Sequence, residues 1–132
     1  MSKDTPSGVE LIGALQRAFG AGDPEALAAL FHPDFSIEQP ASLPHGGRHH
    51  GLAGMQAMGA TFAEHWQRTI SEPRVIDGGD TVVQVTTQTW TSVATGRAAT
   101  VDVVELFAFA DGRILEIRVF QQDTHALLAT LA

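Results

Sequence analysis

The chain has 132 residues, of which 44% are hydrophobic and 17% charged, a composition typical of one soluble globular domain. It contains no cysteine, which excludes disulfides, thiolate metal sites and a cysteine nucleophile and suits a reducing cytoplasm. The net charge of −7 and the scattered arginines argue against nucleic-acid binding, because phosphate contacts need concentrated positive charge. Residues 1–8 are polar and no apolar run approaches the roughly 20 residues of a membrane helix, so we expect a cytoplasmic protein with no membrane partner.

Two helices are predicted in the first third of the chain. Ser7 and Glu10 have the spacing of a capping box, and apolar residues recur at helical spacing over residues 8–20. Asp23, followed by a proline, has the pattern of a second helix start, and Pro33 is expected to end that helix.

A short strand, a loop and a third helix are predicted next. Alternation of apolar and polar residues over residues 35–39 indicates the strand, and residues 40–51 form a loop of Pro, Gly, Ser and His. The third helix is expected to carry one apolar side, made of Met55, Met58, Phe62 and Trp66.

The second half of the chain is rich in predicted strands. Val- and Thr-rich segments separated by turn signals indicate strands over residues 70–77, 81–93, 98–110 and 113–121. Leucines after Asp123 predict a final helix, with Asp123 or Thr124 as its cap. The order of elements indicates a single α+β domain over residues 1–132, in which helices cover one face of an antiparallel sheet.

Three strings carry a family resemblance: residues 19–34, with the glycine and Asp-Pro pair between two helices; residues 44–51, a glycine-bearing loop; and residues 104–118, a closing hairpin. In this order they resemble the NTF2-like superfamily, and most of all its SnoaL-like branch, which holds polyketide cyclases and many proteins of unknown role. The resemblance implies a cone in which a curved antiparallel sheet is wrapped by three to four helices around an apolar pocket. It also implies a homodimer through the sheet, but not one reaction.

Glu105 is the main candidate for chemistry. On its predicted strand it shares the more apolar face with Phe107, which we expect to line the pocket. A carboxyl group that loses hydration has a raised pKa, so it can donate a proton to a developing oxyanion or act as a general acid or base. The resemblance places Glu105 where ketosteroid isomerases hold a protonated acid. The alternative is a glutamate at a sheet edge, or one paired with Arg48 or Arg118.

Gln39 argues against 3-oxosteroid isomerisation. The ketosteroid isomerases place an aspartate before the proline that ends this strand, and glutamine cannot accept a proton. Their helix-1 tyrosine is also missing, because Leu15 stands there and the chain has no tyrosine. We expect Gln39 to orient a ligand carbonyl or hydroxyl, while Glu38 points to solvent unless the strand register differs by one residue.

Histidines in the glycine-rich loop are candidates for proton transfer, since imidazole titrates near neutral pH. The resemblance selects His49, where many relatives have a pocket tyrosine; the alternative is a solvated loop histidine. His45 and His49 are four apart, but no carboxylate joins them, so we expect no metal site. The sequence has no P-loop, dinucleotide fingerprint or nucleophile elbow, so we expect no cofactor.

Further pocket residues are predicted from strand faces. Trp90 shares one face of its strand with amides and hydroxyls, which suits a mixed ligand pocket, and Gln121 is a candidate on the last strand. Phe62 and Trp66 are candidates on the third helix. The face of Val83 and Val85 suits a dimer contact, although the reverse assignment of the two faces stays open.

Two functional hypotheses follow. In the first, the protein is a cyclase, isomerase or lyase that needs no cofactor and acts on a small hydrophobic oxygenated molecule, with Glu105 as acid or base and His49 assisting. In the second, it is a non-catalytic module that binds a small molecule or dimerises. Epoxide hydrolysis lacks support, because no Asp-Arg-Asp set is identifiable.

Overall fold

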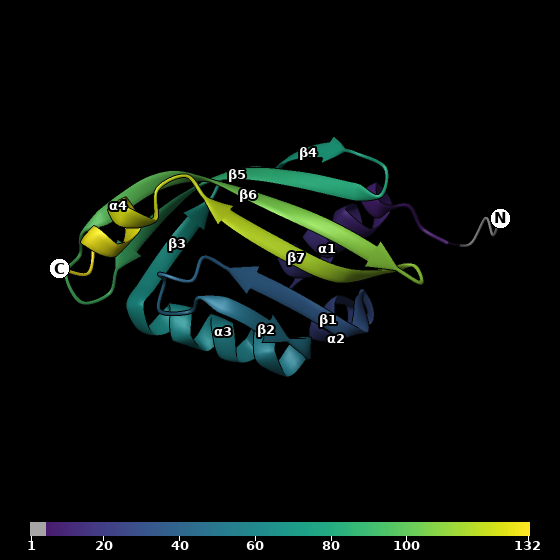
Figure 1. The fold of residues 1–132 in the computed structure, drawn as a ribbon, viewed down its shortest axis with the longest axis horizontal. Coiled ribbons are helices and arrows are strands. Elements are labelled where there is room, and N and C mark those ends of the chain that lie inside the picture. The colour runs from purple at the N-terminus through teal and green to yellow at the C-terminus, as the bar shows by residue number, and fades with distance from the viewer. Residues whose placement is uncertain (1–4) are drawn as a thin grey trace.

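The computed structural model describes residues 5–132, in which helices flank one curved sheet (Figure 1). The helices are α1 (Gly8–Ala21), α2 (Pro24–Ala29), α3 (Gly51–His65) and α4 (Thr124–Ala129). The strands are β1 (Phe31–Gln39), β2 (Gly47–His50), β3 (Trp66–Ile70), β4 (Arg74–Asp77), β5 (Thr81–Ser92), β6 (Ala98–Ala110) and β7 (Arg113–Gln121). None of the helices within the described part of the chain is long and apolar enough to cross a membrane.

The predicted helix starts are confirmed. The backbone N–H of Glu10 donates to Ser7 Oγ over 3.2 Å, and the Ser7 N–H donates to Glu10 Oε1 over 3.0 Å, which completes the capping box. Asp23 caps α2 by accepting from the N–H of Ala26 over 3.1 Å. However, α2 ends at Ala29 and not at Pro33, because the chain joins the sheet at once as β1.

Two strands were missed by the sequence analysis. The loop expected over residues 40–51 contains β2, and Trp66 begins strand β3 instead of closing the third helix. The weak strand expected over residues 70–77 is β4, which starts only at Arg74. The gap between β3 and β4 begins at Ser71, whose side chain replaces its carbonyl as the partner of β5. The Ser71 N–H donates to the Thr87 carbonyl over 2.9 Å, and Ser71 Oγ accepts from the Thr87 N–H over 2.8 Å.

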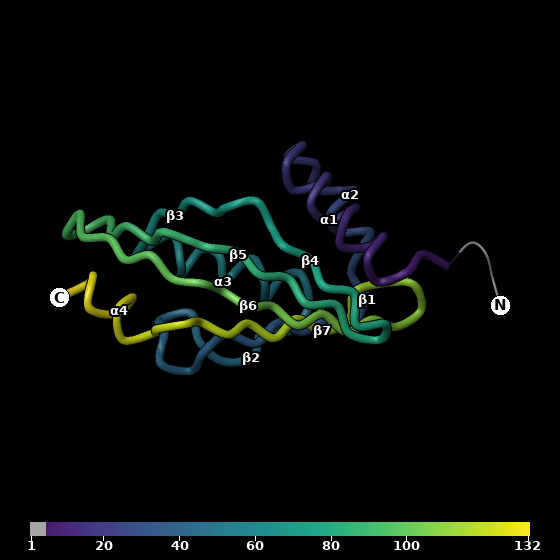
Figure 2. The backbone as a smooth tube through the Cα atoms, turned by 90° about the horizontal axis from the view of Figure 1, so that it is seen from above, coloured from purple at the N-terminus to yellow at the C-terminus, as the bar shows by residue number. Residues whose placement is uncertain are grey.

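The sheet has the strand order β2-β1-β7-β6-β5-β3, with β4 also paired to β5. The pair β1 and β7 is parallel, so the sheet is mixed and not wholly antiparallel as expected. The α+β class and the curved sheet around an interior are confirmed. Helix α3 packs on β1, β2 and β3, whereas α1 packs on β4 to β7. Figure 2 shows α1 and α2 together on one side of the sheet, with α4 at the opposite end of the long axis.

The hydrophobic core lies on the inner face of the sheet. The most deeply buried large side chains come from five strands and two helices: Ile12, Phe35, Trp66, Val82, Trp90, Phe107, Ile114 and Leu127. Trp66 also donates from Nε1 to Thr130 Oγ1 over 2.8 Å, which ties the start of β3 to the end of α4. Because both tryptophans are 1% exposed, one end of the interior is filled with aromatic rings.

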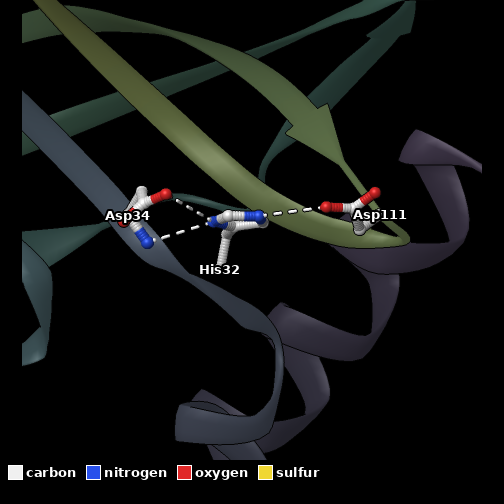
Figure 3. Close-up of polar contacts among 3 residues, drawn as sticks. All are labelled: His32, Asp34 and Asp111. Carbon is white, nitrogen blue, oxygen red and sulfur yellow. Dashed lines mark hydrogen bonds and ion pairs between the residues drawn. The ribbon is translucent and has the colours of Figure 1, made fainter.

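His32 joins the start of β1 to the β6–β7 turn (Figure 3). Its Nδ1 accepts from the backbone N–H of Asp34 over 3.0 Å, so the ring proton sits on Nε2 and is donated to Asp111 Oδ2 over 3.2 Å. Asp111 and Gly112 have φ of 53° and 69°, the left-handed pair of a tight hairpin turn. His32 therefore has a structural role at the end of the sheet.

Candidate functional site

A cavity of about 550 Å³ lies between the inner face of the sheet and the helices. This volume is in the range of small-molecule sites. Most of its wall is apolar and includes Leu15, Leu27, Phe31, Ile37, Met55, Met58, Val103, Phe107, Ile117 and Val119. The polar members of the wall come from five strands and one loop, and they include Gln39, His45, Arg68, Gln84, Thr86, Gln88, Trp90, Glu105 and Gln121.

Glu105 lies in the cavity wall in the middle of β6. It pairs with Gln84 on β5 and with Val119 on β7, and Phe107 follows on the same face. The Gln84 Nε2 donates to Glu105 Oε1 over 3.0 Å, and Gln84 Oε1 accepts from Gln16 Nε2 over 3.0 Å. This chain of amides holds the carboxyl group in one orientation.

Burial raises the pKa of Glu105, while the hydrogen bond from Gln84 and the charge of Arg68 act in the opposite direction. The alternative, in which Glu105 pairs with Arg48 or Arg118, is wrong among the described residues, since the carboxyl group is held by Gln84. Those arginines contact Glu38 over 3.6 and 3.4 Å on the outer side of the sheet, as the strand parity of Glu38 predicted. The cavity thus holds a carboxyl group that retains its proton to higher pH than an exposed glutamate.

Arg68 was missed by the sequence analysis. It pairs with Trp90 across β3 and β5, so its side chain is on the inner side of the sheet. Its guanidinium carbon lies 4.7 Å from the centre of the Phe62 ring. Among the described residues that line the cavity, Arg68 is the one with a permanent positive charge. The alternation of Trp66, Arg68 and Ile70 was the available signal, but this segment was expected to end a helix.

The histidine in the cavity wall is His45 and not His49. His45 is 3% exposed, and its ring centre lies 5.3 Å from that of Phe62, 6.0 Å from Trp66 and 5.7 Å from Trp90. Burial first, and then the charges of Arg68, His49 and His65, lower the pKa of His45 to about 4. His45 is therefore neutral at neutral pH.

His49 lies outside the cavity wall. Its Nε2 is 2.9 Å from the carbonyl oxygen of His45, so it supports the loop that carries His45. Helix α3 covers His49 closely, because a Cβ at Gly54 would lie 3.4 Å from the Cβ of His49. The loop itself is compact: the N–H of Leu43 donates to the Pro40 carbonyl over 3.1 Å, and the N–H of Gly46 donates to the Leu43 carbonyl over 2.9 Å.

The other predicted pocket residues divide into two groups. Gln39, Trp90, Phe107 and Gln121 line the cavity. Phe62 and Trp66 lie behind the wall, where they pack on His45 and Trp90. Trp90 Nε1 donates to Gln88 Oε1 over 2.8 Å, and Gln88 Nε2 donates to Thr86 Oγ1 over 3.0 Å. The polar groups of Trp90, Gln88 and Thr86 are therefore hydrogen-bonded to one another.

Three buried polar atoms of the wall have no protein hydrogen-bond partner within residues 5–132: Gln39 Oε1, His45 Nδ1 and Gln121 Oε1. The other end of the Gln39 amide is used, since Nε2 lies 3.6 Å from Met58 Sδ. A buried polar atom without a partner destabilises the folded state by about 1–3 kcal/mol. All three atoms belong to residues that line the same cavity.

A second, more open hollow of about 370 Å³ lies beyond Gln39 and Gln121. Its one titratable side chain among the described residues is Glu38, which is ion-paired. The inner cavity is consequently the candidate site. Across residues 5–132, no three histidine or acidic side chains gather closely enough to hold a metal ion.

The SnoaL-like domain family matches residues 12–117 of the chain. No curated protein matches the chain significantly.

Solved structures resemble the whole chain. An NTF2-like protein of Burkholderia xenovorans LB400 is 24% identical with a TM-score of 0.83, over 97% of this chain and 99% of that one. TerC, crystallised with polyporic acid, is 26% identical with a TM-score of 0.79, over 93% and 96%. A protein of Pseudomonas putida KT2440, described as a candidate polyketide cyclase, is 19% identical with a TM-score of 0.74, over 96% and 99%. The fold, and the family match over most of its length, show that this chain belongs to the SnoaL-like family within the NTF2-like fold.

Proposed function

We propose that the protein is an enzyme in which Glu105 performs acid/base chemistry on a small hydrophobic oxygenated molecule. The observation that carries this proposal is the carboxyl group of Glu105 in a largely apolar cavity, with a raised pKa and one oxygen held by Gln84. A carboxylic acid that keeps its proton to higher pH can donate a hydrogen bond, which an ionised glutamate cannot do.

The proposed chemistry is proton transfer to and from a carbonyl compound, and it needs no cofactor. Glu105 gives its proton to a ligand carbonyl oxygen, and its carboxylate then takes a proton from the carbon next to that carbonyl. The ligand becomes an enol, and Glu105 regains its proton. Gln84 and the positive charge of Arg68 stabilise the carboxylate that exists between the two steps. The enol can then be reprotonated elsewhere, in an isomerisation, or attack a second carbonyl, in a cyclisation.

Named relatives support a small-molecule site. TerC was crystallised with polyporic acid, and the Pseudomonas putida protein is described as a candidate polyketide cyclase. A cavity of about 550 Å³ whose wall is apolar except for a few polar groups suits ligands of that size.

We also propose that the protein forms a homodimer through the outer face of the sheet. Val83 pairs with Leu106, and Val85 pairs with Val104, which in turn pairs with Phe120. Phe120 is 43% exposed, and the other four side chains are half-buried. A contiguous apolar surface of this kind on a sheet suits contact with a second copy.

A second candidate function is binding without catalysis, and Gln39 favours it. An amide cannot act as an acid or base at any working pH, so Glu105 has no second titratable partner on β1. In that case the cavity would hold its ligand without changing it.

Deuterium exchange separates the two functions. We would incubate 2-tetralone, a two-ring ketone with acidic C–H groups, with the protein in deuterated buffer and follow label uptake by mass spectrometry. Wild type is expected to accelerate the exchange, and Glu105→Gln to reduce that acceleration at least 100-fold while binding the ketone equally well. Glu38→Gln, on the outer side of the sheet, is the matched control. Equal acceleration by wild type and Glu105→Gln would refute a catalytic role for Glu105.

A further inference from the structure

We infer that Gln39, His45 and Gln121 form a hydroxyl-binding subsite facing the Glu105 side of the cavity, so that the site selects a hydrophobic molecule with a hydroxyl group at one end and a carbonyl group at the other. This inference rests on the proposed function for the carbonyl end only. The assignment of the hydroxyl end follows from the buried polar atoms of the cavity wall that have no hydrogen-bond partner.

The unpaired atoms define what the ligand must offer. The amide oxygens of Gln39 and Gln121 accept hydrogen bonds and cannot donate them, so a ligand group that pairs with them carries a proton on oxygen or nitrogen. The third atom, Nδ1 of His45, donates or accepts according to the ring tautomer. A hydroxyl group matches such a set, because it donates its one proton to an amide oxygen and accepts from His45 in the tautomer that carries its proton on Nδ1.

The charge of the wall favours a neutral donor over an ammonium group. Glu105 is the one acidic residue among the described residues that line the cavity. It pairs with Val119 and Gln84 on neighbouring strands, not with Gln39, His45 or Gln121. Arg68 adds a positive charge to the same wall. A buried cation without a countercharge is strongly disfavoured, so we assign the subsite to a hydroxyl group.

The strand register sets the span between the two ends. Glu38 pairs with Arg118 in the parallel β1–β7 pair, so the next residues, Gln39 and Val119, are neighbours. Val119 pairs with Glu105 on β6. Gln39 and Glu105 are therefore two strands apart, which is about 10 Å between their backbones. Two fused six-membered rings with a substituent at each end match such a span.

The test is a binding cycle with four two-ring probes: 6-hydroxy-2-tetralone, 2-tetralone, 6-hydroxytetralin and tetralin. Each is titrated by calorimetry into wild type, Gln39→Leu, Gln121→Leu and Glu105→Gln. Gln56→Leu, on the exposed side of α3, is the control for a glutamine-to-leucine change away from the cavity. The measured quantity is the hydroxyl advantage, which is the ratio of dissociation constants between 2-tetralone and 6-hydroxy-2-tetralone.

We expect a hydroxyl advantage of about tenfold in wild type, Gln56→Leu and Glu105→Gln, and one below about threefold in Gln39→Leu and Gln121→Leu. The side-chain amide signals of Gln39 and Gln121 in ¹H–¹⁵N spectra are expected to shift with 6-hydroxy-2-tetralone more than with 2-tetralone, which tests the subsite in wild type even where a variant folds poorly. An equal advantage in wild type and both leucine variants would overturn the inference. So would an advantage absent from wild type, or no binding of 6-hydroxy-2-tetralone up to millimolar concentration. A failure of the proposed function is distinguishable, because it removes the effect of Glu105→Gln on deuterium exchange and leaves the hydroxyl advantage in place.

Discussion

Gln84 donates a hydrogen bond of 3.0 Å to Glu105 from the position directly opposite on the neighbouring strand. This bond opposes the effect of burial, since it favours the ionised carboxyl whereas desolvation favours the protonated one. The titration of Glu105 is thus set by a balance between its apolar surroundings, which favour the protonated form, and the Gln84 amide with the Arg68 charge, which favour the ionised form.

The first prediction concerns that balance. Gln84→Leu removes the hydrogen bond and adds apolar surface, so it is expected to raise the pKa of Glu105 further. The measurement is a ¹³C NMR titration of the Glu105 side-chain carboxyl in both proteins. Gln56→Leu serves as the control and should leave the midpoint unchanged. A lower midpoint in Gln84→Leu would mean that water reaches the carboxyl once the amide is gone.

The second prediction concerns stability and pH at Glu105. The pKa of Glu105 in the folded state is raised above 4.5, so between 4.5 and the raised value only the folded chain binds the proton. The contribution to stability is present below 4.5 and is lost as the pH rises through the folded pKa. Glu105→Gln has no such proton, so its free energy of unfolding relative to wild type should increase from pH 4 upward. Urea unfolding of both proteins across this range tests it, and a difference that does not change with pH would contradict it.

The third prediction concerns His45, whose pKa shift has the opposite sign. The unfolded chain titrates near 6.5 and the folded chain near 4, so between these values only the unfolded chain takes up the proton. Stability is complete above pH 6.5 and falls as the pH drops toward 4. The shift corresponds to roughly 3 kcal/mol at full burial, and we expect an effect of about 1–2 kcal/mol because solvent screening reduces it. The loss of stability between pH 7 and pH 4.5 should be smaller in His45→Gln than in wild type. Equal losses in the two proteins would show that other groups cause the acid destabilisation.

Much of the site was predictable from residues with clear strand alternation. Trp90 on β5 and Glu105 and Phe107 on β6 lie on long strands rich in Val and Thr, joined by a short turn over residues 93–97, so the period of two defines their common face. His45 and Arg68 could not be chosen in this way. His45 is placed by a compact loop, and Arg68 belongs to a five-residue strand that exists only because β5 pairs with it.

The missed parts of the fold share one cause. Strand β2 has the sequence Gly-Arg-His-His, which lacks the β-branched residues typical of strands, and it forms as an edge strand along β1. The parallel pairing of β1 with β7 joins segments about 80 residues apart, as in the pair of Glu38 and Arg118. Local patterns carry no information on such a pairing, so an antiparallel meander was the natural expectation.

The fourth prediction concerns the unpaired amide oxygens. Leucine has nearly the shape of glutamine and leaves no polar atom without a partner, so Gln39→Leu is expected to stabilise the ligand-free protein by about 1 kcal/mol. A residue kept for folding would behave in the opposite way, because its loss would destabilise the protein. Thermal and urea unfolding of Gln39→Leu and of the control Gln56→Leu give the comparison. Destabilisation by more than about 1 kcal/mol would show that the Gln39 amide supports the fold.

The fifth prediction concerns the outer face of the sheet. Val85 pairs with Val104 at the centre of the apolar surface, so Val85→Glu would bury a charge without a partner in the proposed dimer. We expect wild type to sediment as a dimer and Val85→Glu as a monomer in analytical ultracentrifugation. Thr100→Glu is the matched control, because Thr100 is exposed and lies farther along β6, near the turn after β5. A Val85→Glu protein that stays dimeric and soluble would show that the contact lies on another surface. A wild type that is monomeric at micromolar concentration would show that the apolar face is not a dimer interface, since an interface of about 1,600 Å² buries enough surface to hold two copies together at that concentration.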